Sequence, residues 1–252
     1  MTKKTDIVRI AAVGDIHLGG KGSDAPLQIL FGQVSEHADV LALCGDLTDR
    51  GDPDEARLMA KALGAVTVPI VAVLGNHDYE SGKEREVARI LCDAGVHVLD
   101  GTSFEIYGVG FAGVKGFAGG FGRGALGPWG EEIIKLFVQE ALNEALKLET
   151  ALARLRTEHR IVLMHYSPIE GTVVGEPKEI YPYLGSSRLE EPLTRYPVDA
   201  VFHGHAHHGT AEARTRTGVP VYNVSMNLLQ REHPEGPLFR FLDLEVSGAG
   251  TG

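Results

Sequence analysis

The sequence predicts an α/β domain built around a mainly parallel β-sheet, and three observations support this. The chain has 252 residues, a length suited to one large domain. Hydrophobic residues make up 43% and charged residues 23%, which is ordinary globular usage. In the first third, short β-branched runs alternate with helical patterns, as in repeated βαβ units. We therefore expect one domain over residues 1–246 and a disordered tail over 247–252.

The first third alternates strand-like and helix-like segments. In chain order these are Ile7–Val13, Pro26–His37, Val40–Cys44, Pro53–Leu63, Pro69–Leu74 and Gly82–Ala94. In parallel sheets, ligands bind beyond the carboxyl ends of the strands. Polar residues directly after each strand are therefore the first candidates for a functional site.

The middle of the chain predicts a hairpin, a loop and a long helix. Residues 101–130 interleave glycines with aromatic residues, which indicates strand, turn, strand and then a pliable loop. Glu131–Thr157 has neither proline nor glycine, and its apolar residues recur at helical spacing. After this helix we expect strands at Arg160–Met164, Val198–Phe202, Val219–Val224 and Leu238–Val246, with an irregular segment at Ser167–Ser187.

Charge and composition exclude several classes of function. The formal net charge of -10 disfavours a surface that coats nucleic acid, because polyanions are repelled. No apolar run approaches the roughly 20 residues that cross a bilayer, and no secretory apolar core follows the N-terminus. We therefore expect a cytoplasmic protein without membrane contact. Cys44 and Cys92 both lie in apolar contexts, which predicts small buried side chains rather than a disulfide. The oligomeric state stays open.

Five polar clusters follow the predicted strands. They are Asp15-Ile16-His17, Gly45-Asp46-Leu47-Thr48-Asp49-Arg50, Gly75-Asn76-His77-Asp78, His165, and Gly204-His205-Ala206-His207. Taken singly, each cluster is typical of a turn or cap. Together they reach one edge of a parallel sheet, where gathered carboxylates and imidazoles are best compensated by divalent cations. The sequence therefore predicts a metal centre.

The donor types narrow the choice of metal. Oxygen and imidazole donors without thiolates suit Mn²⁺, Fe, Zn²⁺ or Co²⁺. The candidate ligands are Asp15, His17, Asp46, Asn76, His165, His205 and His207. This set exceeds the need of one ion and fits two ions that share a carboxylate. We expect two ions, Mn and/or Fe, with Zn or Co as alternatives.

The ordered set of motifs resembles the calcineurin-like metallophosphoesterases, and the resemblance extends from Asp15 to His207. It implies a four-layer sandwich of two mixed β-sheets flanked by helices, with a dinuclear metal site at the sheet ends. By the same resemblance, Asp15, His17 and His207 would hold one ion. Asn76, His165 and His205 would hold the other, and Asp46 would bridge the two.

The resemblance also implies a mechanism of phosphate ester hydrolysis. A hydroxide bridging the two ions would attack phosphorus, and His77 would protonate the leaving oxygen as general acid. A carboxylate such as Asp49 or Asp78 would keep the pKa of His77 high enough to hold that proton. Arg50 would pair with a phosphate oxygen, although an ordinary salt bridge is an equally good interpretation.

Several functions remain as alternatives from the sequence alone. A small-molecule phosphodiester is the favoured substrate, with phosphomonoesterase, phosphoprotein phosphatase and nuclease activities behind it. Gly-Asn-His-Asp departs from the Gly-Asn-His-Glu pattern of Ser/Thr protein phosphatases, which weakens that alternative and the roles of Asp49 and Arg50. A non-catalytic metal-binding scaffold for protein partners is the alternative of another class. The complete ligand set and the retention of His77 argue against it. The loops Gly116–Gly130 and Ser167–Ser187 are expected to decide the substrate.

Overall fold

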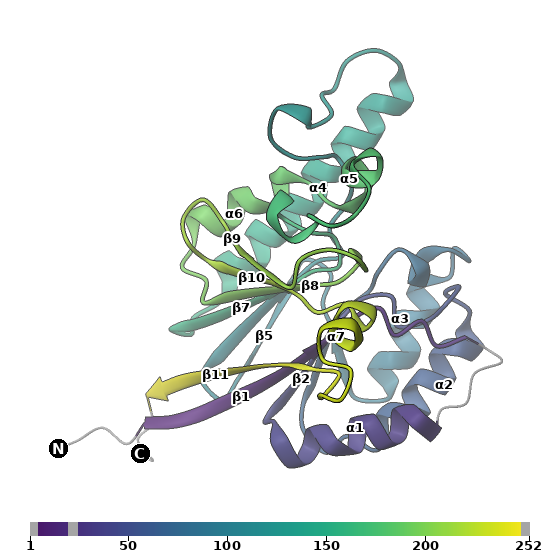
Figure 1. Cartoon of the computed structure of the whole chain (residues 1–252), viewed down its shortest axis with the longest axis vertical. Coiled ribbons are helices and arrows are strands. Elements are labelled where there is room, and N and C mark those ends of the chain that lie inside the picture. The colour runs from purple at the N-terminus through teal and green to yellow at the C-terminus, as the bar shows by residue number, and fades with distance from the viewer. Residues whose placement is uncertain (1–4, 20–24, 248–252) are drawn as a thin grey trace.

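A computed structural model describes residues 5–19 and 25–247 and contains two mixed β-sheets (Figure 1). The first sheet has the order β11-β1-β2-β3-β4. Its strands are β1 (Thr5–Val13), β2 (Val40–Cys44), β3 (Ile70–Val73), β4 (Val96–Val98) and β11 (Arg240–Ser247). Strands β1 to β4 run parallel, and β11 pairs antiparallel with β1.

The second sheet has the order β5-β6-β7-β8-β10-β9. Its strands are β5 (Thr102–Ile106), β6 (Val109–Gly113), β7 (His159–Leu163), β8 (Ala200–His203), β9 (Glu212–Arg214) and β10 (Pro220–Asn223). The central strands β6, β7, β8 and β10 are parallel, while the edge strands β5 and β9 are antiparallel to their neighbours. The carboxyl ends of the parallel strands of both sheets therefore supply the loops that can form a site.

Helices cover the outer faces of both sheets (Figure 1). The longer ones are α1 (Ala25–His37), α2 (Pro53–Leu63), α3 (Glu84–Asp93) and α4 (Glu132–Arg154); the shorter ones are α5 (Tyr181–Leu184), α6 (Glu190–Arg195) and α7 (Met226–Glu232). One buried cluster joins α1 to α3, the first sheet and the inner face of the second, and contains Phe31, Leu43 and Phe111. Another joins α4 to the outer face of the second sheet through Leu148 and Val162. The predicted four-layer α/β sandwich is confirmed.

Two local expectations differ from the structure. Cys44 is buried as expected, but Cys92 is exposed, because on α3 the buried positions are Val87 and Leu91 and the cysteine lies beside them. Ser247, which we expected in the tail, is the last residue of β11, where its backbone pairs with that of Thr5. Residues 248–252 lie outside the described part of the chain.

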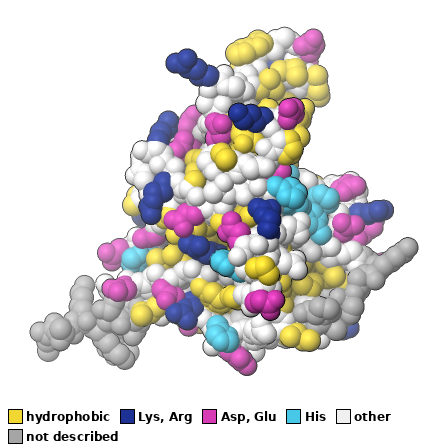
Figure 2. Space-filling view, in the orientation of Figure 1, with side chains coloured by type: hydrophobic (Ala, Val, Ile, Leu, Met, Phe, Trp, Pro, Cys, Tyr) yellow, Lys and Arg dark blue, Asp and Glu magenta, His cyan; other side chains and the backbone are white. Residues whose placement is uncertain are grey.

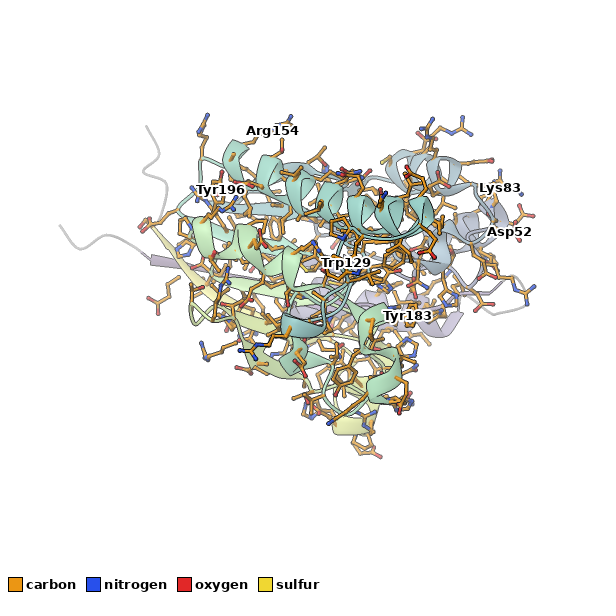
Figure 3. The ribbon with its side chains drawn as sticks, turned by 90° about the horizontal axis from the view of Figure 1, so that it is seen from above. Asp52, Lys83, Trp129, Arg154, Tyr183 and Tyr196 are labelled. Carbon is orange, nitrogen blue, oxygen red and sulfur yellow. The ribbon has the colours of Figure 1, made fainter. Side chains whose placement is uncertain are left out.

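Hydrogen bonds join the two loops that are expected to decide the substrate, Gly116–Gly130 and Ser167–Ser187. The Gly119 amide donates to Pro182 O (2.8 Å), and the Gly120 amide donates to Gly185 O (2.8 Å). A small buried cluster of Phe121, Val173, Leu184 and Ala206 packs between them. The glycine-rich loop is thus fixed by main-chain hydrogen bonds to a distant segment. Figure 3 shows Trp129, which precedes α4, and Tyr183, which lies on α5.

On the face shown in Figure 2, acidic and basic side chains are interspersed, so neither sign of charge predominates there. Exposed apolar residues include Trp129, Ile133 and Leu136, at the α4 end that projects beyond the sheets in Figure 1. Within residues 5–19 and 25–247, none of the helices combines the length and apolar composition that a membrane crossing requires.

Candidate metal centre

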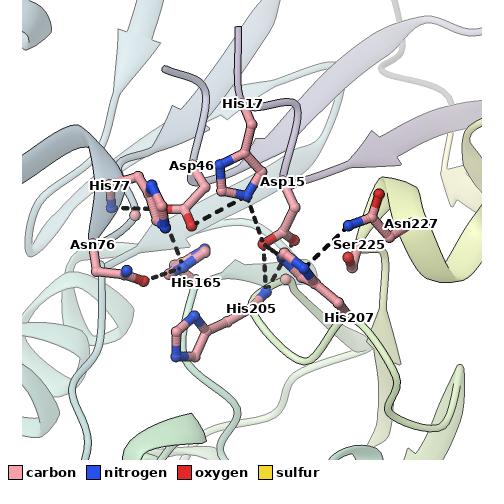
Figure 4. Close-up of polar contacts among 12 residues, drawn as sticks. Asp15, His17, Asp46, Asn76, His77, His165, His205, His207, Ser225 and Asn227 are labelled. Atoms are coloured by element: carbon pink, nitrogen blue, oxygen red, sulfur yellow. Dashed lines mark hydrogen bonds and ion pairs between the residues drawn. The ribbon is translucent and has the colours of Figure 1, made fainter. Parts of the chain in front are cut away.

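The seven predicted ligands lie together where the carboxyl ends of the two sheets meet (Figure 4). Asp15 and His17 follow β1, Asp46 follows β2, Asn76 follows β3, His165 follows β7, and His205 and His207 follow β8. They therefore come from three strands of the first sheet and two of the second. The site depends on how the two sheets pack against each other.

The donor atoms form two groups. In the first donor group, the ligand atoms of Asp15, His17 and His207 lie within 4.8 Å of one another. In the second donor group, those of Asp46, His165 and His205 do the same. The sequence resemblance also groups Asp15, His17 and His207, whereas its second set has Asn76 in place of Asp46, which it assigns as the bridge.

Asp46 lies between the two donor groups. Its Oδ2 is 3.7 Å from His17 Nε2, and its Oδ1 is 3.3 Å from His165 Nε2. Asn76 joins the second group, because its Oδ1 is 2.9 Å from His165 Nε2. The two carboxylate oxygens of Asp46 thus face different groups, as a bridging ligand requires.

Backbone strain concentrates at the ligands. Asp15 (φ 56°), His17 (φ 48°), Asp46 (φ 50°) and His205 (φ 71°) are four of the five described non-glycine residues with positive φ. Each such residue costs on the order of 1–2 kcal/mol in this left-handed region. Main-chain hydrogen bonds hold two of them, from Asp15 N to Gly45 O (2.9 Å) and from His17 N to Asp46 O (2.9 Å). Strain of this kind collects at functional sites, where the surrounding structure can sustain it.

Two motif glycines make room for ligands from other motifs. A Cβ atom on Gly75 would collide with the Asp46 carboxylate, and one on Gly204 would collide with the carboxylate of Asp15. The missing side chains therefore let the ends of different strands approach closely. This explains why glycine precedes the Asn-His and His-Ala-His ligand motifs.

Main-chain carbonyls orient three of the histidine rings. His165 Nδ1 donates to Cys44 O (3.0 Å), His205 Nε2 donates to Tyr183 O (3.1 Å), and His77 Nδ1 donates to Asp49 O (2.7 Å). Because a carbonyl oxygen only accepts hydrogen bonds, the nitrogen that faces it carries the proton. The other nitrogen then stays available, Nε2 in His165 and Nδ1 in His205. Orienting contacts of this type are typical of histidines that bind metals.

The electrostatics of the site fit cations. The carboxylates of Asp15 and Asp46 belong to residues only 3% and 1% exposed, so their charges lie away from water. His17 Nε2 is buried and has no hydrogen-bond partner in the described structure. Burial lowers the pKa of His165, but the Asp46 carboxylate outweighs it and raises that pKa to about 9. Burial lowers the pKa of His205 to about 3. Buried carboxylates and an unpartnered imidazole nitrogen are the donors that divalent metal ions use.

His77 lies beside both donor groups. Its ring meets that of His17 edge-on with centroids 4.5 Å apart, and its amide donates to Asp46 Oδ1 (2.9 Å). One ring nitrogen of His77, one of His17 and a carboxylate oxygen of Asp49 also lie within 4.8 Å of one another. The nearest carboxylate in ion-pair range is that of Glu80, 3.8 Å from His77 Nδ1.

Asp78 and Arg50 lie differently from the other candidates. Asp78 is fully buried and accepts hydrogen bonds from Thr48 N (2.9 Å), Thr48 Oγ1 (2.6 Å) and Gly75 N (2.8 Å). Burial and the nearby Asp46 charge raise the pKa of Asp78. In the described structure no hydrogen bond joins it to His77. The Arg50 side chain is 72% exposed, with Nε 3.7 Å from Asp49 Oδ2.

The structure adds contacts that the sequence did not predict. Asn227 on α7 places its amide nitrogen Nδ2 3.1 Å from His207 Nδ1. The Tyr183 carbonyl approaches His205, and the Glu80 carboxylate approaches His77. The spacing of Glu80, three residues after His77, could have pointed to that contact on a helical turn. The other two contacts carry no local sequence signal.

Comparisons with known proteins agree with this architecture. A search of curated protein sequences finds no match. The phosphopantetheinyl hydrolase PptH of Mycobacterium tuberculosis is similar in structure, with a TM-score of 0.66, 15% identity, and coverage of 92% of this chain and 95% of that chain. A protein of Thermus thermophilus, TT1561, gives a TM-score of 0.57 at 16% identity, with 95% and 99% coverage.

The purple acid phosphatase PPD1 from yellow lupin seeds gives a TM-score of 0.53 at 15% identity, and the match covers 82% of this chain but 39% of that larger chain. These structural likenesses show the shared fold. The family model described as calcineurin-like phosphoesterase matches residues 8–209, which include all five sequence motifs. The chain belongs to the calcineurin-like phosphoesterase family.

Proposed function

We propose that the protein is a dinuclear metal-dependent phosphoesterase whose preferred substrate is a small-molecule phosphodiester. The observation that carries this proposal is the position of Asp46, with one carboxylate oxygen toward each donor group and the His77 amide on Oδ1. A single structural metal would need neither a shared carboxylate nor a neighbouring histidine outside the ligand set. The arrangement therefore favours a catalytic centre over a scaffold.

We assign the ligands to two ions on the basis of the two donor groups. Asp15, His17 and His207 would hold one ion, and Asn76, His165 and His205 the other, with Asp46 shared. The donor set suits Mn and/or Fe, with Zn or Co as alternatives. When bound, the ions supply Lewis-acid activation of water and neutralise charge on the phosphoryl oxygens.

We assign His77 the role of general acid. Its Nδ1–H donates to Asp49 O, so Nε2 is the nitrogen left for the substrate. The Glu80 carboxylate lies 3.8 Å from the same Nδ1. The protonated Nε2 would pass its proton to the leaving oxygen as the ester bond breaks. Asp49 would act through its carbonyl, and Asp78 would hold the loops that carry Asp46 and Asn76 in place.

Arg50 is proposed as a contact for a phosphate oxygen. Its guanidinium is exposed beside the site and pairs loosely with Asp49. A guanidinium can form two parallel hydrogen bonds with a phosphate, and the Asp49 carboxylate would limit its range of motion. Because the pair is exposed, this contact is expected to affect binding more than turnover.

The substrate class rests on weaker grounds than the reaction class. Two structurally similar proteins are named as a hydrolase and a phosphatase, which supports phosphate ester chemistry without separating diesters from monoesters. The net charge of -10 and the interspersed surface charges in Figure 2 argue against a long nucleic acid. A small ester is the substrate class most consistent with these features.

The test uses purified protein supplied with Mn²⁺ and three substrates. Bis(p-nitrophenyl) phosphate represents diesters, p-nitrophenyl phosphate represents monoesters, and a phosphoserine peptide represents protein substrates. We expect hydrolysis that a chelator abolishes, with the diester turned over about tenfold faster than the monoester. Faster hydrolysis of the monoester or of the peptide would contradict the phosphodiester assignment and would make that compound's class the substrate class. If two ions bind but none of the three is hydrolysed, the scaffold alternative gains the support.

A further inference from the structure

His207 is oriented differently from the other histidines at the centre. His77, His165 and His205 donate to main-chain carbonyls, whereas His207 Nδ1 lies 3.1 Å from the side-chain amide nitrogen Nδ2 of Asn227. On the opposite side of the ring, His207 Nε2 is 3.0 Å from Asp15 Oδ1 (Figure 4). Among these four rings, that of His207 has a side chain rather than a main-chain carbonyl as the printed hydrogen-bond partner of the nitrogen that faces away from Asp15 and Asp46, so a point substitution can remove this partner.

The helix that carries Asn227 is fixed to both sides of the first donor group. Met226 N donates to Gly14 O (2.9 Å), and Gly14 N donates to Val224 O (2.9 Å), so the start of α7 is bonded to the end of β1 next to Asp15. Arg231, one turn further along α7, donates to His207 O at 3.1 Å. The helix thus spans the strand end that carries Asp15 and the loop that carries His207.

Hydrogen-bond chemistry defines what Asn227 can do to the ring. An amide presents either its oxygen or its nitrogen to Nδ1, and the two are distinguished only by the network around them. In the structure Nδ2 faces Nδ1. With the amide turned by 180°, Oδ1 accepts from Nδ1–H, so Nε2 is unprotonated and its lone pair points toward Asp15. This is the form of His207 that can bind a cation through Nε2, because a metal needs the free lone pair of that nitrogen.

We propose that Asn227 is a positioning residue that holds His207 in this metal-binding form and thereby sets the affinity of the ion at Asp15, His17 and His207. The inference rests on the proposed dinuclear centre. Asn227 and α7 lie beyond residues 8–209, the part of the chain that the family model matches. A segment outside the matched region would therefore tune one of the two ions without touching the other.

A purely structural role for Asn227 makes a different prediction. Asn227 is exposed and lies one residue after the start of α7, so its removal could weaken the helix alone. In that case, substitution would lower thermal stability and leave both metal affinities unchanged. Metal affinity measured in the absence of substrate separates the two roles.

The experiment titrates the full-length metal-free protein with Mn²⁺, using a competing chelator dye to resolve two successive dissociation constants. For Asn227→Ala we expect one constant to weaken by about 10- to 100-fold and the other to stay within about twofold. For Asn227→Asp we expect the affinity to be kept or increased, because a carboxylate accepts the Nδ1 proton more strongly than an amide. His207→Ala identifies which of the two constants belongs to the first donor group.

The matched control is Asn143→Ala. Asn143 is another exposed helical asparagine whose amide takes part in a hydrogen bond, here from Gln139 Nε2 (2.9 Å) on α4. Its substitution should change neither constant. The visible spectrum of Co²⁺-loaded protein gives a second readout, since Asn227→Ala should alter the absorption of one ion only.

Wild-type affinities for both ions in Asn227→Ala would overturn the inference, as would equal weakening of both. A wild-type protein that fails to bind two ions would overturn it together with the proposed centre. If two ions bind and Asn227→Ala weakens one, but no phosphate ester is hydrolysed, the positioning role stands and the proposed reaction fails. Metal binding therefore tests the role of Asn227, and hydrolysis tests the proposed reaction.

Discussion

The two donor groups of the metal centre differ in burial and in how the protein holds them. In the second group, the His165 and Asp46 side chains are 0% and 1% exposed, and main-chain carbonyls orient its histidines. In the first group, the side chains of His17 and His207 are 21% and 31% exposed. Asp46 and His165 are therefore buried within the fold, whereas His17 and His207 are partly open to the solvent from which a substrate arrives.

Removing the shared ligand should affect both groups and have the largest effect. For Asp46→Ala we expect hydrolysis to fall by about 10⁴-fold, because the residue faces both donor groups and accepts a hydrogen bond from the His77 amide. Metal analysis should show at most one ion per chain. Asp93 is exposed at the end of α3, and the control variant Asp93→Ala should retain both ions. Two ions retained in Asp46→Ala would contradict the bridging assignment.

His77 belongs to neither donor group, so its loss should leave both intact. For His77→Ala we expect turnover of an alkyl diester to fall by about 10²-fold with metal content unchanged. The loss should be smaller for a nitrophenyl diester, whose leaving group needs no proton. Equal losses for both leaving groups would rule out the general-acid role, and lost metal would make His77 a ligand.

Asp78 accepts hydrogen bonds from the two loops that carry Asp46 and Asn76. Asp78→Ala leaves the amides of Thr48 and Gly75 without their buried acceptor. We expect the free energy of unfolding, measured with urea in chelator, to fall by about 3 kcal/mol. Asp78→Asn should recover part of this loss. If Asp78 instead took part in the reaction, Asp78→Asn would recover stability without recovering activity, which we do not expect.

The difference in exposure predicts that the two ions leave at different rates. Chelation should remove the ion of the first donor group about tenfold faster than that of the second, because two of its proposed ligands, His17 and His207, are partly open to water. The release can be followed by the appearance of the metal–dye complex. In His17→Ala, only the slow phase should remain. A single phase in the wild-type protein would mean that exposure does not distinguish the two sites.

Arg50 should give the smallest effect. Its guanidinium is 72% exposed, and exposed ion pairs contribute little to stability. For Arg50→Ala we expect KM for a phosphate ester to rise about threefold with kcat nearly unchanged, and Tm to shift by less than about 2 °C. An unchanged KM would leave Arg50 as an ordinary salt-bridge partner of Asp49.

The clustering of the candidate ligands could be predicted from the sequence, whereas their orienting contacts could not. Asp15 and Asp46 follow parallel strands of the first sheet, and side chains at such positions meet at one edge. His165 follows a strand of the second sheet, so its approach to them depends on how the two sheets pack. The partner of His77 was predicted as an Asp49 or Asp78 carboxylate. The structure instead has the Asp49 carbonyl, and every residue type carries such a carbonyl, so no pattern marks it.

Longer-range features of the fold were harder to predict. The residue pattern indicated a mainly parallel sheet, and the division into two mixed sheets came from the family resemblance. The antiparallel edge strands β9 and β11 depend on pairing with β10 and β1, and the local periodicity of a sequence does not show which strands pair. The glycine-rich loop was predicted to be pliable, but hydrogen bonds from Gly119 and Gly120 to the segment around α5 fix it.

The central claim is that two ions, sharing Asp46, serve a reaction that His77 completes. The most direct test titrates metal-free protein with Mn²⁺ and records hydrolysis of a phosphodiester after each addition, in wild type and His77→Ala. Our account predicts that wild-type hydrolysis rises to a plateau at two ions per chain. The variant should bind the same two ions and remain at least about 10²-fold slower with an alkyl diester. A plateau at one ion, or a variant as fast as wild type, would contradict it.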